Sequence, residues 1–218
     1  MLKADLHIHT KYSMDCSTPL DQIIERCLDI GINCLAVADH GTISGALEMK
    51  RIAPFTVIVA EEILTSAGEI MGLFLSDEIP SNLSLEETLN RIKAQGGLVC
   101  IPHPYDRFRQ SALKRNAFKR IMPSVDIVEV LNARNLTPGS EARAKKLMLK
   151  HGKLASAGSD AHSIMEIGNA YIEMPEFVDK DEFLESLAQG EIKGHRSSPL
   201  VHLISTRNRI EKRFNEGK

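Results

Sequence analysis

The chain has 218 residues, of which 43% are hydrophobic and 26% are charged, and a formal net charge of -2. This length allows one large domain with a sizeable core, and the composition is ordinary for a globular protein. The small net charge argues against a general polyanion-binding surface, so we expect nucleic acid only as a substrate and not as a stable partner. The sequence shows neither a membrane-spanning apolar run nor a signal-peptide pattern, and its four cysteines are scattered. These features predict a cytoplasmic protein without a membrane partner.

The first predicted strand covers residues 4–10 and carries two histidines, His7 and His9, one residue apart. Side chains of a strand alternate between its faces, so both imidazoles lie on the same side. An isolated pair of this kind is more often an ordinary packed or surface pair. Here, however, five further apolar runs also end in polar groups, mostly acids and imidazoles, at residues 35–40, 57–62, 98–103, 127–132 and 154–162. Six such strand ends predict a barrel with an active site at one end.

Amphipathic helices alternate with these strands. The first begins with Thr18 as the expected N-cap and Pro19 in the first turn, and Gly31 ends it. The further expected elements are a strand at 34–38, a helix at 43–53, a strand at 56–61, a strand-turn-strand insertion at 63–75, a helix from the capping box at 84–87 to Gly96, strands at 98–101 and 126–131, a helix at 138–151, strands at 154–158 and 169–173, and a helix at 179–189 capped by Glu182.

Strands that alternate with helices predict a parallel sheet in one α/β domain at residues 1–200, and the polar strand ends favour a closed barrel. An open doubly wound sheet is the alternative, but no GxGxxG motif follows a strand. Segment 105–123 is basic, and a solvated surface is its default interpretation. The tail at 201–218 is mixed in character and is a candidate terminal helix.

The polar groups at the strand ends are imidazoles and carboxylates without thiolates. This donor mixture suits Zn²⁺, Mn²⁺ or Fe²⁺ at a catalytic site, and the groups are too many for one ion. Two or three divalent ions would use them and would clamp a phosphoester, with a metal-bound hydroxide as the nucleophile. The alternative is a network of salt bridges, which would leave many ionisable groups crowded together without cations.

These residues resemble the polymerase and histidinol phosphatase (PHP) superfamily. The blocks that carry the resemblance occur in order over about residues 1–200: Asp5-Leu6-His7-Ile8-His9-Thr10 with Tyr12-Ser13 and Asp15, Ala38-Asp39-His40-Gly41, Glu62-Ile63-Leu64-Thr65, Ile101-Pro102-His103-Pro104, and Gly158-Ser159-Asp160-Ala161-His162. The resemblance implies a distorted (β/α)7 barrel with a trinuclear metal centre, and a metal-dependent phosphoric ester hydrolase.

The resemblance also implies a ligand set. The first metal would be held by His7, His9, Glu62 and Asp160, the second by Glu62 and His103, and the third by Asp15, His40 and His162. Glu62 is preferred to Glu61 because it directly precedes Ile-Leu-Thr. Many members place a histidine where this chain has Glu69, and we expect Glu69 to ligate instead; an exposed glutamate at a strand start is the alternative.

Proton transfer and substrate binding need further groups. Asp39, His40 and His162 are the candidate catalytic residues, with Asp39 either hydrogen-bonded to a ligand imidazole or itself a ligand. Arg107 and Arg134 follow strand ends and are candidate phosphate contacts, although a surface ion pair is an equal alternative for either.

The expected substrate is a phosphorylated small molecule, a nucleotide or an oligonucleotide end, in a monoester or diester. Histidinol-phosphate phosphatase is a second enzymatic interpretation, and a non-catalytic metal-binding module of a larger assembly is a third. The ligand blocks are complete and no polymerase domain accompanies them, which favours catalysis.

Overall fold

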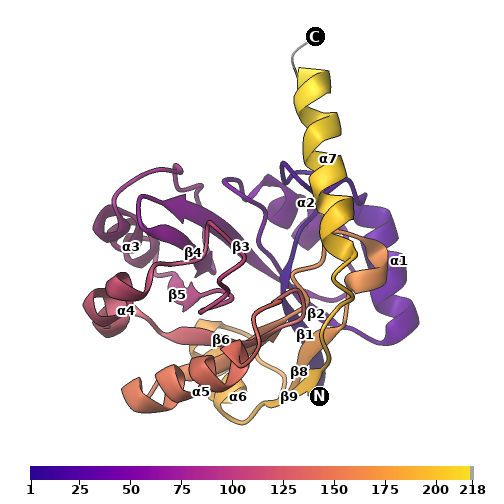
Figure 1. Cartoon of the computed structure of the whole chain (residues 1–218). Helices are drawn as coiled ribbons and strands as arrows, with labels where there is room; N and C mark the ends of the chain where they lie inside the picture. The colour runs from indigo at the N-terminus through magenta and orange to yellow at the C-terminus, as the bar shows by residue number, and fades with distance from the viewer. Residues whose placement is uncertain (217–218) are drawn as a thin grey trace.

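The computed structural model describes residues 1–216, which form a curled sheet surrounded by helices (Figure 1). The strands are β1 (Leu2–Ile8), β2 (Cys34–Val37), β3 (Thr56–Thr65), β4 (Gly68–Leu73), β5 (Leu98–Ile101), β6 (Ile127–Asn132), β7 (Leu154–Gly158), β8 (Ala170–Met174) and β9 (Glu191–Gly194). The α-helices are α1 (Leu20–Ile30), α2 (Ser44–Ile52), α3 (Leu85–Ala94), α4 (Arg115–Ile121), α5 (Ser140–His151), α6 (Lys180–Ala188) and α7 (Val201–Glu216). Within residues 1–216, no helix is both long and apolar enough to cross a bilayer.

The sheet has the strand order β7-β6-β5-β4-β3-β2-β1-β8-β9. Strands β1 to β3 are parallel, as are β5 to β7, whereas β4 runs antiparallel to both of its neighbours. The reversal arises because a tight turn after Thr65, rather than a helix, joins β3 to β4, as the turn signal at 65–68 predicts. The expected distorted barrel is therefore confirmed for β1 to β7, and the antiparallel pair β8 and β9 extends the sheet beyond β1.

The barrel closes where the end of β7 meets the end of β1. The backbone N–H of Asp160 donates to the carbonyl of His7 at 2.7 Å, and that of His9 donates to the carbonyl of Ala161 at 3.0 Å. A Cβ at Gly158 would lie only 2.3 Å from Cβ of His7, so this contact requires glycine. We call this closure between β7 and β1 the seam. It brings the first and last motif blocks of the barrel together.

The helices begin and end largely where the local signals place them. Gly31 adopts the left-handed conformation that ends α1, and Ser84 caps α3 by accepting from the N–H of Glu87. Two details differ from expectation. Pro19, not Thr18, occupies the cap position of α1, where no side chain caps the helix, and Asp179 is the side chain that caps α6.

The core has two parts, one on each face of the sheet. One lies between the sheet and the surrounding helices and includes Ile23 of α1 and Ile92 of α3. The other includes small residues such as Ala36 and Ala60, together with Phe183 of α6. Small side chains fit the narrow interior of a strongly curled sheet, which leaves the strand ends to carry the polar groups.

Candidate metal centre

All nine residues predicted as metal ligands lie at one end of the barrel. His7 and His9 come from the end of β1, Asp15 from the loop after it, His40 from the loop after β2, Glu62 from β3, Glu69 from β4, His103 from the loop after β5, and Asp160 and His162 from the loop after β7. Eight of the nine are buried, and the side chain of His40 is 13% exposed. The structure thus brings the predicted set together.

Glu62 is the centre of this cluster. Its Oε1 lies 2.6 Å from Nε2 of His103, and its Oε2 lies 3.4 Å from Nε2 of His7, Nε2 of His9 and Nδ1 of His40. The Nε2 atoms of His7 and His9 are themselves 3.2 Å apart. Several nitrogens therefore converge on one carboxylate.

Asp15 is the centre of a second group of ligand atoms. Its Oδ1 lies 3.2 Å from Nε2 of His162, and its Oδ2 lies 3.5 Å from Nε2 of His40. Ligand atoms of His9, Asp15, His40 and His162 all lie within 4.8 Å of one another. The residues expected at the third metal are therefore adjacent, and His9 joins them.

Glu69 lies beside both Glu62 and His40. Its Oε2 is 3.6 Å from Nε2 of His103 and its Oε1 is 3.9 Å from Nδ1 of His40. The residue is 5% exposed, so its placement differs from that of an exposed strand-start glutamate. Glu69, Glu62 and His40 form a further group whose ligand atoms lie within 4.8 Å.

The donor atoms fit divalent cations. Oε2 of Glu62, Oε2 of Glu69 and Oδ1 of Asp160 are buried and accept no hydrogen bond from the part of the chain that the structure describes. An unpaired buried carboxylate oxygen is costly, whereas a cation would neutralise it. Ligands 2.0–2.2 Å from a tetrahedral metal are about 3.4 Å apart, the separation seen around Oε2 of Glu62. The residues present therefore suit Zn²⁺, Mn²⁺ or Fe²⁺.

Hydrogen bonds orient two of the imidazoles. Nδ1 of His7 lies 3.1 Å from Oε1 of Glu129, and Nδ1 of His162 lies 2.8 Å from the carbonyl of Asp160. Each Nδ1–H can donate to that acceptor, which leaves Nε2 free to ligate. Glu129 also accepts from the N–H of His103 and from Nδ2 of Asn132, so it fixes several parts of the centre.

The ligands differ in their pKa values. Burial would lower the pKa of His7 and His40, but nearby carboxylates outweigh it, so the pKa of His7 lies well above its usual range and that of His40 is raised to about 9. Burial lowers the pKa of His9 to about 4, and burial together with positive neighbours lowers the pKa of His162 to about 4. Burial would raise the pKa of Asp160, but Arg109 and His7 outweigh it and hold this pKa well below its usual range. Neutral imidazoles and an ionised carboxylate are the ligating forms, so His9, His162 and Asp160 are already in the form that binds a metal, whereas His7 and His40 would each release a proton on binding one.

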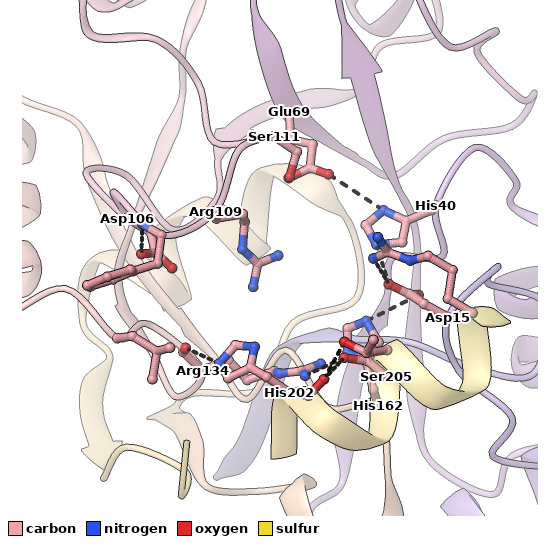
Figure 2. Close-up of a pocket in the computed structure, with 14 residues that line it drawn as sticks. Asp15, His40, Glu69, Asp106, Arg109, Ser111, Arg134, His162, His202 and Ser205 are labelled. Carbon is pink, nitrogen blue, oxygen red and sulfur yellow. Dashed lines mark hydrogen bonds and ion pairs between the residues drawn. The ribbon is translucent and has the colours of Figure 1, made fainter. Parts of the chain in front are cut away.

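A cavity of about 340 Å³ opens beside the cluster (Figure 2). Asp15, His40, Glu69 and His162 lie on one side of it, and Arg109, Arg134, His202 and Ser205 are among the residues that line the rest. Figure 2 shows the Arg109 side chain pointing into the opening, and α7 carrying His202 and Ser205 along one edge. The cavity therefore joins the ligand cluster to basic side chains.

The arginines are placed differently from one another. Arg109, in the loop after β5, forms an ion pair with Asp160, and Arg134 is 2% exposed with its Nε 3.3 Å from Oε1 of Glu166. Arg107 is exposed and lines a neighbouring cavity instead. Of the two arginines expected to contact phosphate, Arg134 lines the cavity and Arg107 does not. Arg109, which was not among them, also lines the cavity.

Asp39 also lies apart from the cavity lining. Its two oxygens accept from the backbone N–H of Thr10 at 2.6 Å and from the Thr10 hydroxyl at 2.7 Å. Both oxygens are thereby engaged, and neither contacts the His40 ring. Asp39 holds the loop after β1 in place, whereas His40 and His162 face the cavity.

Four residues of the site escaped the sequence analysis: Glu129, Arg109, His202 and Arg209. Glu129 carries a usable signal, because it is a charged residue inside the apolar run of β6 and buried acids need partners. Arg109 lies in the loop after β5, and His202 and Arg209 lie on α7, where the sequence does not indicate which side chains face the cavity.

Comparisons with known proteins agree with this architecture. A family model described as PHP domain matches residues 5–98, and one described as PHP-associated matches residues 138–192. Two proteins of Methanocaldococcus jannaschii are similar: MJ0417 is 35% identical over 85% of this chain and 79% of its own, and MJ1587 is 41% identical over 61% of this chain and 82% of its own.

Solved structures share the fold at low identity. PsfC from Pseudomonas syringae superposes with a TM-score of 0.68 at 15% identity, over 96% of this chain and 98% of its own. A two-domain protein of Bacteroides vulgatus, described as containing a predicted PHP-like metal-dependent phosphoesterase, superposes with a TM-score of 0.69 at 16% identity, over 97% of this chain and 69% of its own. The two family models and the ordered ligand blocks agree, and the chain belongs to the polymerase and histidinol phosphatase superfamily.

Proposed function

We propose that this protein is a metal-dependent phosphoesterase that hydrolyses a phosphomonoester or phosphodiester at a centre of two or three divalent ions. The observation that carries the proposal is the environment of Glu62, whose Oε2 accepts no hydrogen bond among the described residues and faces three imidazole nitrogens at 3.4 Å. Family membership and the basic side chains in the adjoining cavity support the same reaction class.

The ligands divide into three sets in this proposal. His7, His9, Glu62 and Asp160 would hold one ion, Glu62, Glu69 and His103 a second, and Asp15, His40 and His162 a third, with His9 close to the last set as well. Divalent ions bound there would supply Lewis-acid activation of water and of the phosphoryl oxygens.

The chain itself would bind and orient the substrate. A guanidinium is a forked donor suited to phosphate oxygens, and Arg109 and Arg134 line the cavity. The leaving alcohol needs a proton. His40 and His162 line the cavity and could donate one only at a centre of two ions, in which neither of them binds a metal. A His→Gln change at a proton donor would reduce turnover of alkyl phosphates far more than of p-nitrophenyl phosphate, because p-nitrophenolate leaves without protonation.

Hydrolysis by the Mn²⁺- or Zn²⁺-reconstituted protein across a panel of esters tests the proposal. The panel contains p-nitrophenyl phosphate, its bis ester, nucleoside mono- and bisphosphates, histidinol phosphate, and short RNA and DNA oligonucleotides. We expect turnover that Asp160→Ala abolishes and that Glu185→Ala, a change at an exposed residue of α6, leaves intact.

The panel also separates the alternatives. Exclusive turnover of histidinol phosphate would identify a histidinol-phosphate phosphatase. Full metal content without turnover of any ester would reject the phosphoesterase and favour a metal-binding module.

A further inference from the structure

The C-terminal helix α7 lies along one edge of the cavity and is held there by polar contacts (Figure 2). Nη2 of Arg134 donates to the carbonyl of Val201 at 3.3 Å and to Oγ of Ser205 at 2.8 Å, and Nε2 of His202 lies 3.1 Å from the carbonyl of Arg134. Farther along the helix, Nζ of Lys212 donates to the carbonyls of residues 11 and 13 at 2.6 Å. The helix is thereby held to the loop after β6 through its first turns and to the loop after β1 farther along.

One face of α7 contributes to the cavity wall. His202, Ser205, Thr206 and Arg209 line the cavity, and their spacing of three and four residues places them on the same side of the helix. On other sides of the helix Leu203 and Phe214 are 67% and 73% exposed. The helix therefore presents its polar side to the cavity, and these apolar side chains face away from it.

Arg209 reaches the metal centre itself. Its Nη2 donates to Oδ2 of Asp15 at 3.1 Å, while the other oxygen of Asp15 lies 3.2 Å from Nε2 of His162. The Arg209 side chain is 48% exposed, so its guanidinium is also reachable from the cavity. It is thus a cation at the rim of the ligand cluster, supplied by an element outside the barrel.

The cavity is small. Its volume of about 340 Å³ is close to the lower end of the range for small-molecule sites, about 300 to 1,000 Å³. Such a space holds a phosphoryl group and one compact leaving group. A polymer chain would have to pass α7, which the contacts of Arg209 and Lys212 hold against the loop after β1.

We propose that Arg209 binds the phosphate of the substrate and that α7 restricts the site to small phosphomonoesters. This inference rests on the proposed function and narrows its substrate class. Arg209 would donate to phosphate oxygens from the side of α7, while ions held by the Asp15 and Glu62 groups face the phosphate from the barrel. A longer phosphodiester would require the helix to move away.

Binding of inorganic phosphate tests the role of Arg209 without requiring turnover. We expect calorimetry on the Mn²⁺-loaded protein to show about tenfold weaker phosphate binding in Arg209→Ala, with partial recovery in Arg209→Lys. Arg207→Ala is the matched control, because Arg207 lies on the same helix and pairs with Glu211. Equal phosphate affinity in Arg209→Ala and the native protein would overturn the assignment.

Kinetics on p-nitrophenyl phosphate separate this inference from the proposed function. Loss of a contact made equally in ground and transition states raises KM and leaves kcat nearly unchanged, so we expect a KM about tenfold higher in Arg209→Ala. Unchanged KM in an active enzyme would refute the inference alone. If no ester is hydrolysed, the phosphoesterase fails, and the phosphate affinity still decides whether Arg209 binds the anion.

The double variant Arg209→Ala/Lys212→Ala tests the size restriction. It removes the three hydrogen bonds that Arg209 and Lys212 donate to the loop after β1. We expect kcat/KM for a short 5′-phosphorylated oligonucleotide to rise at least about tenfold relative to p-nitrophenyl phosphate. An unchanged ratio, or a native protein that already prefers the oligonucleotide, would refute the restriction.

Discussion

Glu61 and Glu62 are adjacent in β3 and have opposite environments. Oε2 of Glu61 accepts from the N–H of Ile79 at 2.9 Å, and burial raises its pKa to about 7. Glu62 instead faces the imidazoles of the ligand cluster. Strand alternation sends neighbouring side chains to opposite faces, so only one of the two acids can reach the centre.

Glu69→Ala tests the departure of this chain from the family pattern. If Glu69 ligates the second ion together with Glu62 and His103, we expect the variant to retain one ion fewer than the native protein. Elemental analysis of the dialysed protein measures the stoichiometry. Glu87→Ala, at a half-exposed position on α3, is the control. An unchanged metal content in Glu69→Ala would remove Glu69 from the ligand set.

Glu129→Gln tests the orientation of His7. The substitution keeps the side-chain shape but weakens the acceptor for Nδ1–H of His7, which lies 3.1 Å away. Loss of such a partner typically lowers metal affinity by about 10- to 100-fold. Competition with a metal chelator measures the change, and Glu191→Gln on the exposed strand β9 should not alter it. Native affinity in Glu129→Gln would show that His7 needs no such partner.

At the residue level, the sequence predicts ligands well and orienting groups poorly. His7, His9 and Asp160 stand in contiguous motif blocks at strand ends, so their types and order indicate a metal site. Glu129 orients His7, which lies 122 residues away in the sequence. No local sequence pattern can predict a contact over that separation.

Among the elements, α7 is joined to the barrel through a buried ion pair. Arg134 and Glu166 are 2% and 1% exposed at their side chains, and Arg134 also holds Ser205 of α7. Removing one member of a buried pair leaves an uncompensated charge. The junction between the barrel and α7 should therefore be sensitive to substitution.

We expect Arg134→Ala to lower the free energy of unfolding by about 3 to 5 kcal/mol, because it leaves Glu166 buried without its cation. Urea denaturation measures the change. The control is Arg196→Ala, whose partner Glu141 is 41% exposed at its side chain, and a change within about 1 kcal/mol is expected there. Equal effects of the two substitutions would show that the Arg134 pair does not act as a buried one.

The elements differ in how far their sequences specify them. The β3–β4 insertion was predictable, because the turn between its strands has its own residues. The loop after β5 was not, since Arg107 and Arg109 are chemically identical and only the fold decides that Arg109 enters the cavity. Strand β9 was also missed, because its residues are exposed or half-buried and show no apolar alternation.

At the scale of the whole molecule, the seam is the place where the closed barrel has no room for an added side chain. A side chain at residue 158 would force apart the backbones of β7 and β1. Overpacking of this kind usually costs about 1 to 3 kcal/mol.

We therefore expect Gly158→Ala to lower stability by that amount and to reduce metal content as well, because His7 is the residue displaced. Gly72→Ala is the comparison, since its new Cβ would meet only side-chain atoms of Leu75 and Ile92 at 3.1 to 3.2 Å, which can shift. Thermal unfolding and elemental analysis measure both effects. A Gly158→Ala protein with native stability and metal content would contradict the tight contact at the seam.

The closed architecture followed from the alternation of strands and helices, and from polar residues at so many strand ends. The strand at 169–173 was expected, but its place was not: β8 and β9 join the sheet outside the barrel, β8 pairing antiparallel to β1 and β9 antiparallel to β8. Strands of this kind can pair only where the sheet has an open edge. The order of strands and helices along the chain does not show where that edge lies.

The seam also bears on how the chain folds. The proposed ligands come from residues 7 and 9 on one side and 160 and 162 on the other, so an ion shared between them closes a loop of about 150 residues. Closing so long a loop costs the unfolded chain considerable conformational entropy, and contacts of such large sequence separation form slowly. Metal uptake is thus expected late in folding, and bound ions should slow the unfolding of this ring of strands more than they accelerate its formation.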